Sequence, residues 1–396
     1  MNRRYFLTSA GALSLSHILA GCSNKNQETL KIRVLKNSVP PQLLNEFRKI
    51  VSTPINLDFT PVTQLQELFK ELQTWQQKKD NPIPEKSWFS FLPWVSNKSN
   101  TIPDLVMLGD YWLGKAIEQK LIQPLDTQQL TKWQQLPQRW KNIVTRNEKG
   151  EFDANGKIWG APYRWGSTVI AYRRDKFAKL GWTPTDWSDL WREELRDRIS
   201  LLNSPREVIG LTLKKLGYSY NTQQLDQIPN LKSELQKLHS SVKFYSSNNY
   251  LQPLILEDTW VAVGWSSDIL PIIENLPNDI TAVIPLSGTS IWVDLWVKPA
   301  NINDTNSAPS ANFAQQWIDF CWQPQLAAQF SILGKAAFPM LTGINREELP
   351  KTIRENSLIL PNADIFQRSE FLLPISGNAI QQYQALWQEI RTSSRY

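Results

Sequence analysis

The sequence predicts an α/β protein built from two lobes, and three observations support that prediction. Segments with the two-residue alternation of β-strands are followed by segments with the helical period along most of the chain. The chain has 396 residues, more than the roughly 250 to 300 that a single hydrophobic core usually holds. Glycines bracket an aromatic, extended segment at residues 157–172, where a backbone that crosses between lobes could bend.

Residues 1–22 are predicted to be an export signal that takes no part in the fold. Residues 2–7 (NRRYFL) resemble a twin-arginine signal, and residues 19–22 (LAGC) resemble the lipobox of a bacterial lipoprotein. The apolar run between them is too short and too rich in Ser, Thr and Gly to span a bilayer. We therefore expect a periplasmic protein held on the membrane by a lipid on Cys22. A plain membrane anchor and an ordinary buried cysteine are the alternatives.

The first part of the chain alternates strands with helices after a polar linker at residues 23–29. The predicted order is a strand at 30–34, a helix opened by Pro40 and Pro41, a strand at 55–59, a helix at 62–78, an aromatic insertion at 80–103 and a strand at 105–108. Whether the insertion packs down or binds something is left open. Ligands of open α/β sheets lie beyond the carboxyl ends of strands, so Tyr111 is a candidate wall residue. The alternative is a ring that packs on the helix it begins.

The alternation continues beyond the glycine-bracketed segment. The predicted elements are a helix at 204–217, a strand from 260 that turns at Gly264, a strand at 280–285, and helices at 313–320, 326–333 and 379–391. Ser204 and Glu207 match the Ser-x-x-Glu pattern of a capping box, with proline at the first helical position. Glu207 could therefore serve only to close its own helix end.

Residues 288–299 (GTSIWVDLWVKP) alternate with a period of two and carry one acid in an apolar setting. In a strand, Trp292, Asp294 and Trp296 would share one face, so a carboxylate would stand between two indoles. An unpaired half-buried carboxylate is costly, and indole faces attract cations, so this face suits an organic cation. The alternative is an Asp that caps a loop or pairs with an arginine of the protein itself.

Seven segments in the same order resemble the polyamine-binding family of periplasmic solute-binding proteins, the spermidine and putrescine receptors of ATP-driven importers. They are residues 38–41 (SVPP), 103–106 (PDLV), 161–167 (APYRWGS), 187–191 (WSDLW), 205–207 (PRE), 216–222 (LGYSYNT) and 292–294 (WVD). The resemblance covers nearly all of the chain that follows the signal. It implies a two-lobed, type II periplasmic binding protein whose ligand lies in the cleft between lobes. Crossovers are implied at about 162–165 and near Ile291, with lobe 1 formed by 30–163 and 292–340 and lobe 2 by 164–291 and 341–396.

The same resemblance implies the residues that line the cleft. By motif they are Asp294, Trp292, Trp265, Glu207 and Tyr111. The chain also departs from the family at five positions where the family's side chains meet or approach the ligand. These are Leu35, Lys36, Ser38, Ser204 and Phe338. A lysine at the mouth of the pocket would repel a polyamine, so the identity of the solute stays open.

Composition and motifs argue against other functions. The formal net charge is +6, and no cluster of Lys and Arg interleaved with aromatics indicates nucleic-acid binding. One histidine, His239, follows the signal, and neither a metal-ligand cluster nor a phosphate-binding glycine loop is present, so we expect no enzyme, metal or cofactor. We expect a monomer that captures a polyamine or related cation and delivers it to an ABC permease. A sugar, amino acid or iron chelate as solute, and a lipid-anchored sensor, are the alternatives.

Overall fold

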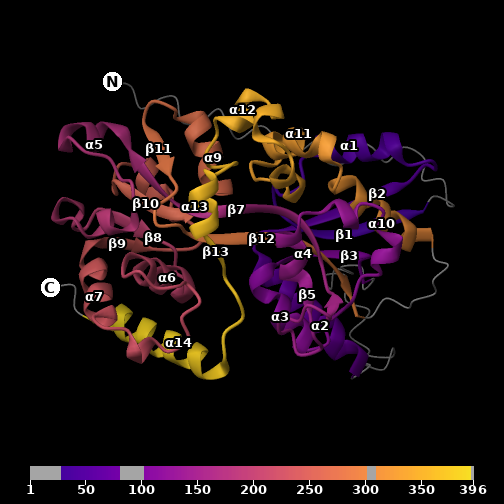
Figure 1. Ribbon diagram of the computed structural model, residues 1–396, viewed down its shortest axis with the longest axis horizontal. Helices are drawn as coiled ribbons and strands as arrows, with labels where there is room; N and C mark the ends of the chain where they lie inside the picture. The colour runs from indigo at the N-terminus through magenta and orange to yellow at the C-terminus, as the bar shows by residue number, and fades with distance from the viewer. Residues whose placement is uncertain (1–27, 81–101, 301–308, 394–396) are drawn as a thin grey trace, which may run out of the picture.

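The computed structural model describes residues 28–80, 102–300 and 309–393. Figure 1 shows two α/β halves side by side, with the N-terminal strands in the right half and helices α5 to α7 in the left half. The predicted α/β architecture of two lobes is confirmed, and we call the right half lobe 1 and the left half lobe 2. The signal with Cys22 and most of the 80–103 insertion lie outside the described residues.

A single mixed sheet runs through both lobes. Its path is β2-β1-β3-β12-β7-β10-β8-β9, with β4, β11 and β13 attached at its sides. In lobe 1 lie β1 (Thr29–Leu35), β2 (Asn56–Val62), β3 (Leu105–Gly109) and β4 (Ile122–Gln123), and in lobe 2 lie β8 (Ile199–Leu201), β9 (Val242–Tyr245), β10 (Val261–Trp265) and β11 (Ile280–Val283). A separate small sheet pairs β5 (Thr145–Arg146) with β6 (Lys157–Ile158).

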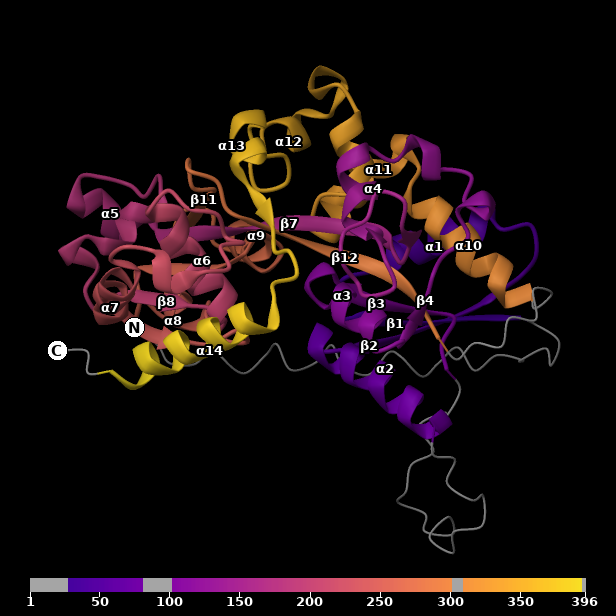
Figure 2. The same ribbon diagram turned by 60° about the horizontal axis from the view of Figure 1, so that its bottom comes forward.

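Two long strands belong to both lobes, and they cross the middle of the molecule together (Figure 2). They are β7 (Ala161–Arg173) and β12 (Ser290–Pro299). The first half of β7 pairs with β12, and its second half pairs with β10 and β11 of lobe 2. The second half of β12 pairs with β3 of lobe 1. The two crossovers are thus hydrogen-bonded to each other, so a movement of the lobes must twist this ribbon.

Helices cover both sheet faces in each lobe. Lobe 1 carries α1 (Pro41–Ile50), α2 (Leu65–Asp80), α3 (Asp110–Glu118), α4 (Gln138–Val144), α10 (Pro309–Cys321) and α11 (Pro324–Gly334). Lobe 2 carries α5 (Arg174–Leu180), α6 (Pro205–Lys215), α7 (Leu231–Ser241), α8 (Gln252–Ile255), α9 (Ser266–Asn275) and α14 (Gly377–Thr392). Among the described helices, none is both long and apolar enough to cross a membrane.

A third link joins the lobes near the C-terminus. It contains α12 (Lys351–Arg354), α13 (Ala363–Arg368) and β13 (Glu370–Phe371), and then descends to α14 (Figure 2). The Trp140 indole of α4 donates to Thr342 Oγ1 at 2.8 Å, and Arg139 donates to the carbonyl of Phe366 at 3.1 Å. The segment from 342 to about 369 is therefore held on lobe 1, although the resemblance assigned all of 341–396 to lobe 2.

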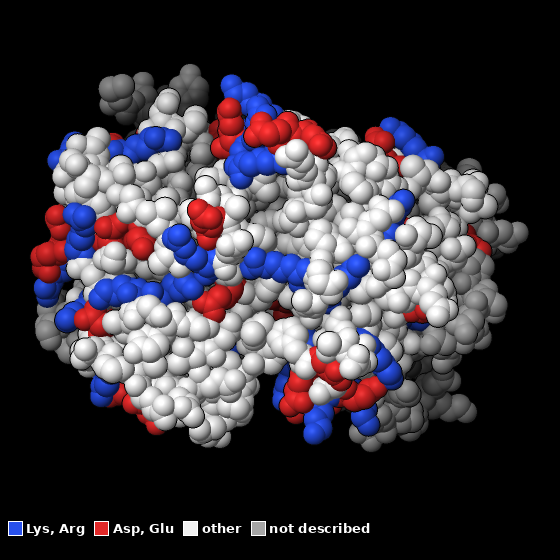
Figure 3. All heavy atoms as spheres, viewed as in Figure 1, with Lys and Arg blue, Asp and Glu red and all other residues white. Residues whose placement is uncertain are grey.

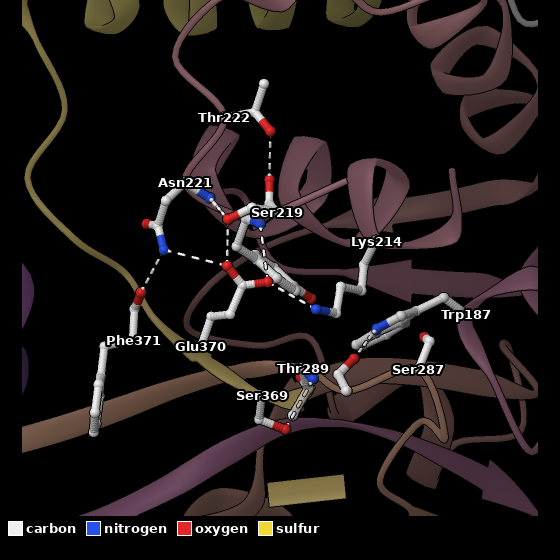
Figure 4. Close-up of polar contacts among 12 residues, drawn as sticks. Trp187, Lys214, Ser219, Asn221, Thr222, Ser287, Thr289, Ser369, Glu370 and Phe371 are labelled. Atoms are coloured by element: carbon white, nitrogen blue, oxygen red, sulfur yellow. Dashed lines mark hydrogen bonds and ion pairs between the residues drawn. The ribbon is translucent and has the colours of Figure 1, made fainter. Parts of the chain in front are cut away.

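Glu370 ends this segment and fastens it to lobe 2. Figure 4 shows its carboxylate between Lys214, whose Nζ lies 2.7 Å from Oε1, and the hydroxyl of Ser219. Beside it, Asn221 Nδ2 donates to the carbonyl of Phe371 at 2.9 Å. The chain thus leaves lobe 1 at β13, and α14 packs on α6 and α7.

Candidate functional site

The pairing of β7 with β10 and β12 places three of the candidate ligand residues, Trp265, Trp292 and Asp294, side by side on the sheet. Trp265 lies opposite Thr168, and Trp292 lies opposite Gly166. Asp294 lies opposite Arg164 on one side and Gly109 on the other. Directly opposed residues of an antiparallel pair project to the same face, so these residues form one surface where the two lobes meet. The surface of the molecule is hollowed between the lobes in Figure 3.

Asp294 forms an ion pair with Arg164 inside the protein. Arg164 Nε donates to Asp294 Oδ2 at 2.8 Å, and both side chains are almost wholly buried. The Arg164 guanidinium carbon also lies 5.7 Å from the centre of a Trp292 ring. Burial raises the pKa of the Asp294 carboxyl, and the positive charge of Arg164 opposes that rise. The alternative that the sequence left open, an Asp paired with an arginine of the chain, is therefore present in the structure.

Trp296 does not accompany Asp294 to the cleft. A β-bulge interrupts the pairing of β12 with β7 between Asp294 and Leu295. Beyond it, the Trp296 ring is fully buried and packs 4.6 Å from Tyr163 and 6.0 Å from Trp317, measured between ring centres. The expectation that two indoles of this strand could meet a ligand is wrong for Trp296, because the rings of Tyr163 and Trp317 pack on it, although β12 keeps its regular pairing with β3.

Gly166 lets Trp292 lie flat against the neighbouring strand. A Cβ atom built at Gly166 would lie 2.3 Å from the Trp292 ring and 2.5 Å from Ser266 Oγ. The sequence indicated a bending point at the glycines of this segment. The structure shows instead a close approach, in which the missing side chain makes room for the indole.

Glu207 is buried and points away from its own helix end. Ser204 makes no side-chain capping bond to α6, and Glu207 Oε2 accepts a hydrogen bond from Ser290 Oγ of β12 at 2.7 Å. The capping-box interpretation is therefore wrong, because the carboxylate crosses to the sheet. Burial raises the pKa of this carboxyl, and Ser290, Thr168, Arg206 and Trp265 partly offset the effect. Among the described residues, no cation lies within ion-pair distance of Glu207.

Tyr250 binds the last residue of β10 and Asp268 in the first turn of α9. Its hydroxyl accepts from the Trp265 backbone N–H at 3.0 Å and donates to Asp268 Oδ2 at 3.1 Å. Gly264 permits this arrangement, because a Cβ there would lie 1.9 Å from the Tyr250 ring. Asp268 keeps an exposed edge, yet desolvation raises the pKa of its carboxyl. Sequence reasoning missed Asp268, although it lies just after the strand that ends at the predicted Trp265, in the first turn of α9.

On the lobe 1 side, Asp110 and Tyr111 begin α3. Tyr111 is 47% exposed and its ring meets Trp112 edge-on at 5.1 Å, so it packs partly on its own helix while keeping an open face. Asp110 was not selected from the sequence. It is buried and accepts from the Val293 N–H at 3.1 Å.

The pKa of Asp110 is raised to about 7. Burial is the largest cause, the charge of Asp294 adds to it, and the Val293 N–H and Arg146 oppose it. A carboxyl whose pKa lies near neutrality carries a proton for part of the time at physiological pH, so the charge of the cleft depends on pH.

The positions that depart from the resembled family divide between core and surface. Phe338 is fully buried and packs 5.0 Å from the Tyr163 ring. Ser38 is also buried, and its hydroxyl donates to the Leu35 carbonyl at 2.6 Å. Lys36 is exposed. Phe338 and Ser38 therefore stabilise lobe 1, whereas Lys36 stays in solvent at the end of β1.

Comparisons with known proteins agree with this architecture. A family model described as bacterial extracellular solute-binding protein matches residues 100–368. The spermidine/putrescine-binding periplasmic protein of Salmonella typhimurium is 26% identical over 385 residues, covering 97% of each chain. That of Haemophilus influenzae is 25% identical over 399 residues, covering 97% of this chain and 99% of the relative. The crystal structure of a spermidine/putrescine substrate-binding protein from Streptococcus pneumoniae superposes with a TM-score of 0.73 at 20% identity, over 92% of this chain and 99% of that one.

Proposed function

Because this chain belongs to the bacterial extracellular solute-binding proteins, we propose that it captures a small organic cation between its lobes and delivers it to an ABC permease. It would do so as a monomer in the periplasm. The named relatives bind spermidine and putrescine, so amines are the first class to test. The observation that carries the proposal is Glu207, a buried carboxylate with neutral groups at its oxygens and the indole of Trp265 beside it.

Physical chemistry supports a cationic solute at this place. A buried carboxylate without a cationic partner costs free energy, and an incoming ammonium would remove that cost. Indole faces add attraction for a cation, and both Trp265 and Trp292 keep exposed area in the cleft. Asp268 and Asp110 place further negative charge nearby.

The experiment is a calorimetric and thermal-shift panel on protein that lacks residues 1–22. Putrescine, spermidine and single-ammonium compounds form the test set, and neutral sugars form the control set. A ligand at about 100 times its Kd should stabilise the folded state by roughly 2.7 kcal/mol. If no amine shifts the melting temperature while a sugar does, the proposed solute class is wrong.

Affinity for an organic ammonium is expected to rise between pH 6 and pH 8. The pKa of Asp110 is about 7, so its carboxyl loses its proton across this interval and adds negative charge to the cleft. An aliphatic ammonium, with a pKa of roughly 10, keeps its charge over the same range. Calorimetric titration in half-unit pH steps measures the effect. Asp110→Asn retains an acceptor for the Val293 N–H and should flatten the profile; an unchanged slope in that variant would exclude Asp110 as its source.

The empty protein should respond to pH in the opposite direction. The folded state holds the Asp110 proton up to a pKa of about 7, whereas the unfolded chain releases it near the ordinary value of 3.8. The associated stability is fully present below about pH 4 and is lost as the pH rises through 7. Urea unfolding of wild type and Asp110→Asn at pH 5 and pH 8 should therefore show the variant gaining relative stability at pH 8.

We further propose that Cys22 carries a lipid anchor. Cys22→Ala should release the protein from the membrane fraction, because the acyl chains on that cysteine would be its attachment. Cell fractionation with a salt and carbonate wash measures this. Cys321→Ala is the matched control, since Cys321 is buried in lobe 1 and should not affect fractionation. Retention of Cys22→Ala after the wash would exclude the anchor.

A further inference from the structure

We propose that Arg164 determines the specificity of the cleft by occupying the place beside Asp294 and Trp292 that a second ammonium of the solute would need. The solute then carries one ammonium, directed to Glu207, and its other end accepts hydrogen bonds. This inference rests on the proposed function and narrows the solute from organic cations in general to compounds with a single ammonium.

The two acids that the cleft presents on the β12 side differ in their partners. Glu207 receives hydrogen bonds from neutral groups and makes no ion pair within the described residues, although the charge of the adjacent Arg206 acts on it. Asp294 is matched by Arg164 at 2.8 Å. A second cation at Asp294 would have to share that carboxylate with a buried guanidinium and would meet its repulsion. At Glu207 an ammonium meets no cation of the described residues within ion-pair distance, whereas at Asp294 it meets the guanidinium of Arg164, whose charge also acts on Asp268.

The distance between the Glu207 end and the Asp294 end of the cleft follows from the residue spacing along β12. Ser290, which binds Glu207, and Asp294 are four residues apart on β12, about 13 Å at 3.3 Å per residue. Trp292 lies midway between them; its ring packs on Gly166 of the neighbouring strand and keeps part of its area exposed. A short linear compound lying along the indole would therefore reach toward Glu207 with one end and toward Arg164 with the other.

Arg164 has N–H groups that can donate to an end group of the solute. Nε is used by Asp294, and Nη1 makes a long contact of 3.5 Å with the Gly334 carbonyl. Within the described chain, Nη2 has no hydrogen-bond partner. Guanidinium groups bind carboxylates and other oxygen acceptors through paired N–H donors, and they cannot lose their charge at physiological pH. A hydroxyl or carboxylate end is therefore accepted, and an ammonium end is not.

The test compares three probes of matched length on protein that lacks residues 1–22. Putrescine has an ammonium at both ends, 4-aminobutanol has one ammonium and a hydroxyl, and 4-aminobutanoate has one ammonium and a carboxylate. Wild type should bind at least one of the single-ammonium probes tenfold or more tightly than putrescine. Arg164→Gln should gain tenfold or more in putrescine affinity. The control Arg196→Gln removes an exposed arginine of lobe 2 and should leave all three affinities unchanged.

Two results would overturn the inference. One is a wild type that binds putrescine as tightly as, or more tightly than, both single-ammonium probes. This wild-type result is decisive even if Arg164→Gln does not fold. The other is a folded Arg164→Gln that gains no putrescine affinity. Either result leaves the proposed function intact if putrescine or spermidine binds wild type. If wild type and Arg164→Gln bind no amine at all, the proposed function itself fails.

Discussion

Asp294→Asn is expected to lower the free energy of unfolding by about 3 kcal/mol, the low end of the range for breaking a buried ion pair. The substitution leaves the guanidinium of Arg164 buried without its countercharge, although asparagine still offers an oxygen to Nε. Equilibrium unfolding in urea measures the change as a shift in midpoint at constant slope.

Two further variants separate this effect from a general loss of charge. The double variant Asp294→Asn with Arg164→Gln removes both charges and should recover most of the stability, since no unpaired ion remains. Asp226→Asn removes an exposed carboxylate and should change stability by less than about 0.5 kcal/mol. If Asp294→Asn unfolds at the same urea concentration as Asp226→Asn, the buried pair does not contribute to stability as described.

Glu207→Gln is expected to weaken binding of the best amine by about 2 to 5 kcal/mol, which corresponds to roughly thirtyfold to several thousandfold in Kd. Glutamine keeps an acceptor for Ser290 but offers no charge to an ammonium. The empty protein should be as stable as wild type or more stable, because burial raises the pKa of this carboxyl and its ionised form is therefore disfavoured in the folded state. Calorimetric titration and urea unfolding measure the two effects separately.

Glu234→Gln is the matched control for that experiment. Glu234 is also a buried glutamate of lobe 2, but Lys237 lies 2.7 Å from its carboxylate and Lys215 also contacts it. The hydrogen bond from Lys215 is the leading contribution that lowers the pKa of Glu234, against an opposing effect of burial. This variant should lose stability and keep its affinity for the amine. Equal affinity losses in both variants would mean that Glu207 acts through folding and not through contact with the solute.

Local patterns correctly predicted the two strands and the helix that carry the candidate residues. The alternation of residues 288–299 identified β12 and placed Trp292 and Asp294 on one face, because side chains of a strand follow a period of two whatever surrounds it. The strand that ends at Trp265 and the helix that begins near Glu207 were found in the same way. Local sequence could not predict where the Glu207 carboxylate would point, since a capping bond and a bond to a distant strand use the same side chain.

The sequence by itself determined the two-lobed α/β fold and the strands and helix that carry the candidate residues. Apolar periodicity depends only on neighbouring residues, and the length of the chain indicated more than one core. The tertiary structure alone decided which charges meet. Arg164 and Asp294 are 130 residues apart and become partners through the register of β7 with β12. Tyr163 and Trp317, which are also distant in sequence, pack on Trp296 and place that indole in the core. Coulomb energy and burial depend on distances across the fold, so whether an acid of the cleft is free for a solute is decided only when the strands pair.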